Sequence, residues 1–191
     1  MAVARNFLSA VLLCAALGVS AEPIWVGRFS EADPAIPAPW KIEHLNEKYP
    51  PTRYALRRWD GVVAIEAQAD KSMALLGRPV AVDLKKTPIL CWQWRIDAPV
   101  ASADMNRKSG DDYAARVYLT FDQVPDAALN YVWDNIHPVG TLQDNAYTDR
   151  TRMLVLRSGA GKAGAWVQER RNVRKDFQLA FGDIGGQLSG L

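Results

Sequence analysis

Charged and aromatic side chains gather between residues 89 and 122, and their types suit the binding of a polar ligand. Arginine donates paired hydrogen bonds to carboxylates and hydroxyls, aspartate accepts hydrogen bonds, and tyrosine or tryptophan offers a ring for stacking. Side chains of this kind recognise saccharides when they line a concave surface. The candidate ligand-binding residues, including one tryptophan further along the chain, are Arg95, Asp97, Lys108, Asp111, Asp112, Arg116, Tyr118 and Trp133.

The same residues allow two other functions. In a polysaccharide-acting hydrolase or lyase, Asp111 or Asp112 would be the general acid/base and Arg116 would stabilise developing charge. In a purely structural envelope interaction protein, the charges would pair with one another and stay buried. The chain contains 21 acidic residues, so carboxylate pairs are common and do not by themselves indicate catalysis. We therefore expect a non-catalytic binding module and leave the catalytic residues unassigned.

An acidic loop precedes the second strand of this stretch, and its oxygen atoms are the ligands that calcium prefers. The order does not follow an EF-hand, because Lys108 and Ser109 occupy positions that should be acidic and glycine. The alternative is an ion pair between the loop aspartates and arginines such as Arg116. We therefore assign no metal or other cofactor and leave a calcium site open, with ligands among Asp104, Asn106, Asp111 and Asp112.

Two further motifs lack the context that their chemistry needs. Residues 159–164 match the glycine-rich pattern G-x-G-x-x-G, but the segment after them is typical of a strand, so we expect a flexible hairpin loop. The only histidines, His44 and His137, are far apart in sequence, which disfavours a zinc site. We expect His137, which precedes a proline, at the surface.

Two predicted strands, 89–97 and 116–121, must position the candidate residues. Each alternates apolar with polar side chains, which is typical of an antiparallel sheet with one face on the core. The polar faces either form a buried ion-pair network or line a groove, and the need to pair buried charges favours the network. On the core face of the first strand we place Leu90, Trp92, Trp94 and Ile96. Trp59, beside a hairpin turn, and Trp133, at the start of a loop, are the candidates for exposed tryptophans, and burial in the core is the more frequent alternative.

The rest of the chain predicts an all-β fold, an antiparallel β-sandwich of jelly-roll type like galactose-binding and carbohydrate modules, with one short C-terminal helix. The helix is predicted over 173–181, between an Asn172 cap and Gly182. Asp60-Gly61 predicts a tight hairpin turn. The other expected elements are strands 22–29, 54–59, 62–67, 72–76, 80–84, 152–157 and 165–170, a proline-rich loop over 33–51 and a helical turn over 125–129.

The first 21 residues have the features of a cleavable secretory signal, with Arg5 before an apolar run and a small-x-small site ending at Ala21. We expect a periplasmic or secreted protein with one domain over 22–191 and no membrane span. The formal net charge of +2 is nearly balanced and suggests no nucleic-acid partner. Cys91, the one cysteine outside the signal, is expected to be a buried apolar residue. The oligomeric state stays open.

Two motifs, Trp92-x-Trp94-Arg95-x-Asp97 and Gly110-Asp111-Asp112-x-x-x-Arg116, resemble an exported bacterial family, the domain of unknown function 3047. The resemblance implies a proteobacterial envelope protein with a β-sandwich, and it implies no activity. Members of that family usually continue past the helix into a strand, an acidic segment and a final strand. This chain stops at Leu191, so we expect a domain without its terminal strands. The predicted partner is a saccharide or another envelope component.

Overall fold

Strands are the main regular secondary structure of the computed structural model, which describes residues 22–29, 35–122, 127–182 and 186–191. The predicted signal, residues 1–21, lies outside the described residues. The elements are β1 Lys41–Glu43, β2 Arg53–Trp59, β3 Val62–Gln68, β4 Leu75–Gly77, β5 Pro79–Asp83, β6 Ile89–Trp94, β7 Ala115–Phe121, β8 Ala128–Asp134, β9 Leu142–Asn145, β10 Thr148–Ser158, β11 Val167–Asn172, α1 Val173–Phe181 and β12 Gln187–Gly190.

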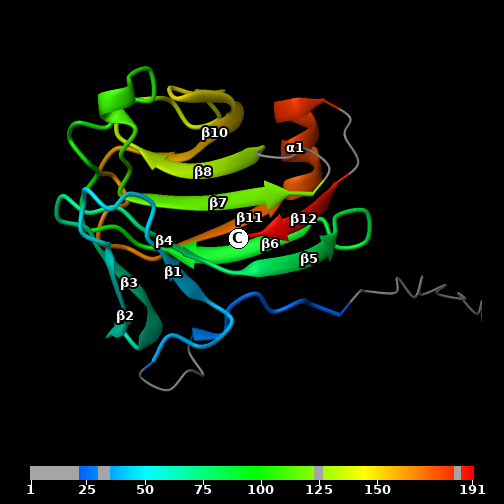
Figure 1. Cartoon of the computed structure of the whole chain (residues 1–191), viewed down its shortest axis with the longest axis horizontal. Coiled ribbons are helices and arrows are strands. Elements are labelled where there is room, and N and C mark those ends of the chain that lie inside the picture. The colour runs from blue at the N-terminus through cyan, green and yellow to red at the C-terminus, as the bar shows by residue number, and fades with distance from the viewer. Residues whose placement is uncertain (1–21, 30–34, 123–126, 183–185) are drawn as a thin grey trace, which may run out of the picture.

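Two layers form the sandwich (Figure 1). The larger is a six-stranded sheet in the order β5–β12–β7–β8–β10–β9, and the smaller is the antiparallel pair β6 and β11. Aromatic side chains join the layers: the Trp92 ring stacks on Tyr131 at 5.3 Å between centroids, and the Trp94 ring lies 5.9 Å from Trp133. The prediction that Trp92 and Trp94 face the core is confirmed, together with Leu90 and Ile96.

β8 is the most deeply buried strand, and all seven of its residues are inaccessible to solvent. One face contributes Tyr131 and Trp133 to the core between the layers. The opposite face, which we call the outer face, packs under the segment 98–114, where Met105 and Tyr113 cover Val132. Coverage on both sides explains why even Asn130 and Asp134, the polar residues of the outer face, are buried.

One strand pair departs from the antiparallel arrangement. β10 runs parallel to β8, whereas every other pair among the described strands is antiparallel. Parallel neighbours need a long connection, and residues 135–147, which include β9, return the chain to the start of β8. The sequence gives each strand its faces but not its direction, so this pairing was not predicted.

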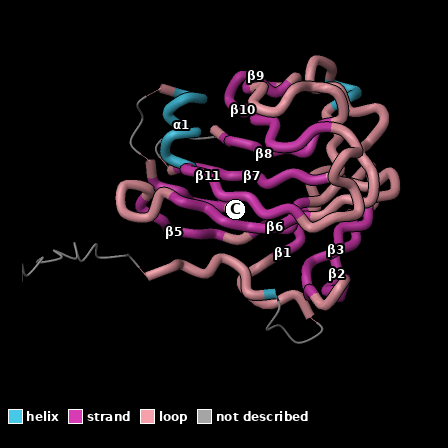
Figure 2. The backbone as a smooth tube through the Cα atoms, turned by 180° about the vertical axis from the view of Figure 1, so that it is seen from behind, coloured by secondary structure: helices cyan, strands magenta, loops and turns pink. Residues whose placement is uncertain are grey.

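The N-terminal elements lie beside the sandwich (Figures 1 and 2). β1 pairs with β4, and β2 with β3 form a hairpin that projects at the lower left of Figure 1. The hairpin turn has Asp60 at φ 50° and Gly61 at φ 83°, and two positive φ angles are what a two-residue turn of type I′ requires. The predicted hairpin is confirmed.

Helix α1 begins and ends where the sequence places it. The Asn172 side chain accepts a hydrogen bond from the Lys175 backbone N–H at 3.0 Å, and Gly182 follows the last turn at φ 88°. Phe177 packs on Phe121 at 4.1 Å between ring centroids and so closes one end of the core. In the described part of the chain, no helix combines the length and apolar character that crossing a bilayer requires.

Several predicted elements are wrong. Residues 22–29 form no strand, because no neighbouring strand pairs with their backbone. The helical turn over 125–129 falls partly outside the described residues, and its last two residues belong to β8. Residues 159–164 are a turn without a hairpin, since β10 and β11 belong to different sheets. The glycine- and serine-rich C-terminal run forms β12 between β5 and β7.

The prediction that Cys91 is buried is also wrong. Its side chain is exposed, because it projects from the face of β6 that points away from the core. The alternation places it on that face beside Gln93, but its small apolar character suggested burial.

Candidate functional site

The predicted site residues fall in three different places. Five of them lie on the outer face of the six-stranded sheet or in the segment that covers it: Lys108, Asp111, Asp112, Arg116 and Tyr118. Within this group Arg116 Nη2 donates to Asp111 Oδ1 at 2.6 Å, and both side chains are partly buried. The Arg116 guanidinium also stacks at 4.7 Å over the Tyr113 ring.

The remaining members of this group make few polar contacts with it. Tyr118 is half-buried opposite Asn130 on β8. Lys108 is exposed and lies 5.4 Å over the Tyr147 ring, and Asp112 is exposed. The interaction between the loop aspartates and an arginine, which the sequence left as an alternative to metal binding, is therefore present at Asp111.

Arg95 and Asp97 lie on the other layer. Trp94 points into the core, so Arg95 points away from it, on the opposite side of the sandwich from Arg116. Arg95 Nη2 is 3.8 Å from Asp97 Oδ1, and the Asp97 side chain is 92 % exposed. Because Asp97 is almost fully exposed, this ion pair contributes little to stability. Arg95 and Asp97 therefore do not share a face of the sandwich with Asp111 and Arg116.

Trp133 is a core residue and not a ligand-stacking residue. It is 1 % exposed, and its indole N–H donates to the Gly159 carbonyl at 3.0 Å. It lies on β8 in phase with Leu129 and Tyr131, and this alternation could have placed it in the core. Trp59 is half-buried and packs edge-on against Trp166 at 6.4 Å.

His137 joins the covering segment to β8 and is not a surface residue. Its side chain is 13 % exposed, and its Nδ1 lies 3.1 Å from Asp134 Oδ1. The same carboxylate oxygen accepts the backbone N–H groups of Ile136 and His137. On the other side of the ring, Nε2 lies 3.0 Å from the Asn106 amide nitrogen. These bonds hold the loop after β8 in position.

Asp104 belongs to the same polar cluster. The Asn106 backbone N–H donates to its carboxylate, and this bond, with the nearby Arg107 guanidinium, lowers the pKa of Asp104. The pKa of Tyr113 is raised, first by burial and then by the Asp111 carboxylate. Among the described residues, no three His, Cys, Asp or Glu side chains are grouped so that they could hold a metal ion.

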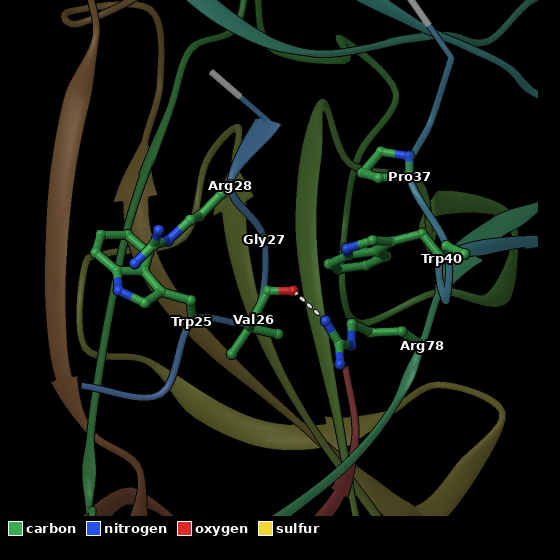
Figure 3. A pocket seen from close by; sticks show the side chains of 8 residues that line it. Trp25, Val26, Gly27, Arg28, Pro37, Trp40 and Arg78 are labelled. Carbon is green, nitrogen blue, oxygen red and sulfur yellow. Dashed lines mark hydrogen bonds between the residues drawn. The ribbon is translucent and has the colours of Figure 1, made fainter. Parts of the chain in front are cut away.

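A pocket lies elsewhere, between the N-terminal segment and the start of β1 (Figure 3). Its volume is about 290 Å³, near the lower end of the range of about 300–1,000 Å³ typical of small-molecule sites. We call it the tryptophan pocket, and its lining residues are Trp25, Val26, Gly27, Arg28, Pro37, Ala38, Trp40 and Arg78.

Local contacts give the tryptophan pocket its shape. The Trp40 ring packs on Phe29 at 5.4 Å, and both rings lie over Gly27. A Cβ atom at Gly27 would come within 2.9 Å of the Phe29 ring and 3.4 Å of Trp40, so any larger residue would displace the Phe29 ring. The Trp40 backbone N–H donates to the Pro37 carbonyl at 3.2 Å. The proline-rich loop therefore fixes one wall of the pocket.

Two arginines bring positive charge to the tryptophan pocket. Arg78 follows β4, and its Nη1 donates to the Val26 carbonyl at 2.6 Å, a bond that Figure 3 shows. Its Nε donates to the Pro79 carbonyl at 3.3 Å. The Arg28 guanidinium lies 4.4 Å over the Trp25 ring, and the exposed fraction of Trp25 is 59 %. Rings and guanidinium groups thus share one small surface.

A family model matches residues 38–191 of the chain, under the description "Protein of unknown function (DUF3047)". The chain belongs to this family. The match confirms the resemblance carried by the Trp-x-Trp-Arg and Gly-Asp-Asp motifs. No curated protein and no solved structure matches the chain. The matched range includes Trp40 and Arg78, while the pocket wall formed by residues 25–28 precedes it.

The sequence reasoning missed the tryptophan pocket. The predicted strand 22–29 includes Trp25, and the predicted proline-rich loop over 33–51 includes Trp40. One signal was available, since Trp25 and Arg28 lie close together in a segment without alternation. No local pattern indicates that Arg78, about 50 residues later, meets them, because that contact depends on the pairing of β1 with β4.

Proposed function

We propose that the protein is a non-catalytic binding module for a saccharide or another component of the bacterial cell envelope, with the tryptophan pocket as its binding site. One observation carries this proposal: the exposed ring of Trp25 and the ring of Trp40 line the same pocket as the guanidinium groups of Arg28 and Arg78. The signal-like segment 1–21 supports a periplasmic or secreted location.

The chemistry of the pocket matches a sugar. Indole rings are large amphipathic surfaces that stack on apolar ligand faces, here the C–H face of a pyranose ring. Guanidinium groups donate several hydrogen bonds in a fixed fork, which suits vicinal hydroxyls and carboxylates. Arg78 is held by two backbone carbonyls, so its orientation is set before a ligand arrives. Such preorganisation reduces the entropy cost of binding.

The lining supports binding more than catalysis. Among the described residues of the pocket, none is Asp, Glu, His, Cys, Ser, Thr or Lys, so these residues supply no general acid, base or nucleophile. Of the two carboxylates considered for a hydrolase, Asp111 lies in an ion pair with Arg116 on another part of the molecule, and Asp112 is exposed beside it.

A glycan array tests the proposal directly. Residues 22–191 would be labelled and screened against neutral and acidic glycans, and hits would be measured by calorimetry. We expect Trp25→Ala to weaken binding about fivefold to tenfold, because truncating an aromatic anchor costs more than about 1 kcal/mol.

Leu179→Ala is the matched control, since Leu179 is an exposed apolar residue of α1 that does not line the pocket. It should bind like the wild type. Absence of any glycan hit, or equal binding by Trp25→Ala and Leu179→Ala, would refute the proposed site.

A further inference from the structure

A second pocket lies between β1 and the β2–β3 hairpin. Its volume is about 480 Å³, and we call it the hairpin pocket. It combines apolar groups with hydrogen-bonding groups, which is the mixture that a sugar requires. The lining residues are Ile42, Pro51, Thr52, Arg53, Tyr54, Ala55, Arg57, Glu66 and Gln68.

β1 connects the two pockets. Trp40, immediately before β1, lines the tryptophan pocket, and Ile42, in the middle of β1, lines the hairpin pocket. Residues two apart in an extended chain project to the same side, about 7 Å from each other. β4 lies beside both pockets: its Leu76 pairs with Ile42 of the hairpin pocket, and the residue after β4 is Arg78 of the tryptophan pocket. The pockets are therefore neighbours held by one strand ladder.

The hairpin pocket has fixed polar groups of its own. The Tyr54 hydroxyl donates to the Ala74 carbonyl at 2.9 Å, which ties β2 to the segment before β4. Arg57 Nε donates to Glu66 Oε2 at 3.3 Å across the hairpin. Ile42 is exposed and adds an apolar surface beside these groups.

The charge of the combined lining is positive. Four arginines line the two pockets, Arg28, Arg53, Arg57 and Arg78, against a single acidic residue, Glu66, among the described lining residues. Arginine pairs well with carboxylate because two parallel N–H groups match its two oxygens. A surface with this excess of arginines attracts an anionic ligand.

We propose that the two pockets are adjacent subsites for one extended acidic polysaccharide, so that the protein binds a chain of uronic-acid-containing sugars more tightly than a free monosaccharide. This inference rests on the proposed function of the tryptophan pocket. It adds the polymeric nature and the charge of the ligand. One sugar unit occupies the tryptophan pocket, and the chain continues past Ile42 into the hairpin pocket.

The test measures affinity against ligand length. Oligogalacturonides of one to six units, and neutral cello-oligosaccharides of the same lengths, would be titrated by calorimetry into residues 22–191. We expect the acidic series to bind more tightly than the neutral one, and its affinity to rise about tenfold or more with length, because the second subsite is filled intramolecularly. Added salt should weaken the acidic series.

Variants separate the two subsites. The double variant Ile42→Ala/Arg53→Gln should remove most of the gain with length and leave the affinity for the single unit unchanged. The matched control is Leu45→Ala/Arg58→Gln, which likewise replaces one aliphatic residue and one arginine nearby without touching either pocket lining. Thermal unfolding of both variants verifies that they fold.

Each outcome decides one claim. Equal affinity for one and six units, or a full length gain in the Ile42→Ala/Arg53→Gln variant, overturns the extended site and leaves the proposed function standing. Equal binding of the neutral series overturns the acidic character. If neither series binds and the glycan array has no hit, the proposed function fails as well.

Discussion

At the scale of single residues, the best-defined electrostatic feature is the link between β8 and α1. The Tyr131 hydroxyl donates to Asp176 Oδ2 at 2.7 Å, and Arg171 donates to both oxygens of the same carboxylate at 2.6 and 2.9 Å. The Asp176 side chain is buried, so its charge depends on these two partners.

Removing Asp176 should be strongly destabilising. Asp176→Ala leaves the buried Tyr131 hydroxyl without its acceptor and Arg171 without its ion-pair partner. We expect a loss of about 2–5 kcal/mol in the free energy of unfolding, measured by urea denaturation. Asp97→Ala is the control, because that aspartate is almost fully exposed, and it should change stability by less than about 0.5 kcal/mol. Similar losses in both variants would contradict the argument.

Tyr131 should also give the protein an alkaline limit. Burial, followed by the Asp176 carboxylate, raises the pKa of Tyr131 above its ordinary value near 10. The unfolded state therefore loses this proton at lower pH than the folded state does. The stabilisation is complete below about pH 10 and is lost as the pH rises above it. Tyr113, whose pKa is also raised, acts in the same direction.

The measurement is the urea midpoint between pH 8 and 11. We expect it to fall above about pH 10 in the wild type and to fall less steeply in Tyr131→Phe, which has no phenolic proton to lose. Parallel curves for the two proteins would show that Tyr131 does not contribute.

At the scale of elements, local signals predicted structure well and long-range pairing was not predictable. Helix α1 was correct to the residue, because Asn172, the repeat of Val173, Phe177 and Phe181, and Gly182 lie within a dozen positions of one another. The turn at Asp60-Gly61 was equally local. β12 was missed, since only Leu188 of its four residues is apolar and the strand forms by pairing with β5 and β7 on its two sides.

The candidate site follows the same rule. The pairing of Asp111 with Arg116 was anticipated because five positions separate the two residues. The tryptophan pocket was not anticipated, because Arg78 reaches Val26 only after β1 and β4 have paired.

The Asn172 cap offers a test at this scale. Asn172→Ala removes the acceptor for the Lys175 backbone N–H and should cost about 1 kcal/mol of folding stability. Asn172→Asp keeps an acceptor at the helix N-terminus and should be close to neutral. Urea denaturation of the two variants measures the difference, and an equal loss in both would exclude capping as the cause.

At the scale of the whole molecule, one wall of the tryptophan pocket and the core of the sandwich are formed by different parts of the chain. Residues 22–29 supply half of the tryptophan pocket and form no strand of either layer. β12, in contrast, lies inside the six-stranded sheet, and Leu188 is buried in the core. Deleting residues 22–29 should therefore keep the cooperative thermal transition and abolish glycan binding. Deleting residues 187–191 separates β5 from β7 and should abolish the transition itself.

Leu188→Ala is a milder change to β12 than the deletion of residues 187–191. Truncating a buried leucine costs about 2–5 kcal/mol of folding stability, so this variant should lower the transition temperature without abolishing the transition. Calorimetry of the three variants measures all of these effects. If the chain without residues 22–29 unfolded without a cooperative transition, the N-terminal segment would be part of the folding unit and not only a wall of the pocket. If the chain without residues 187–191 kept the wild-type transition, β12 would contribute little to the sheet despite its position between β5 and β7.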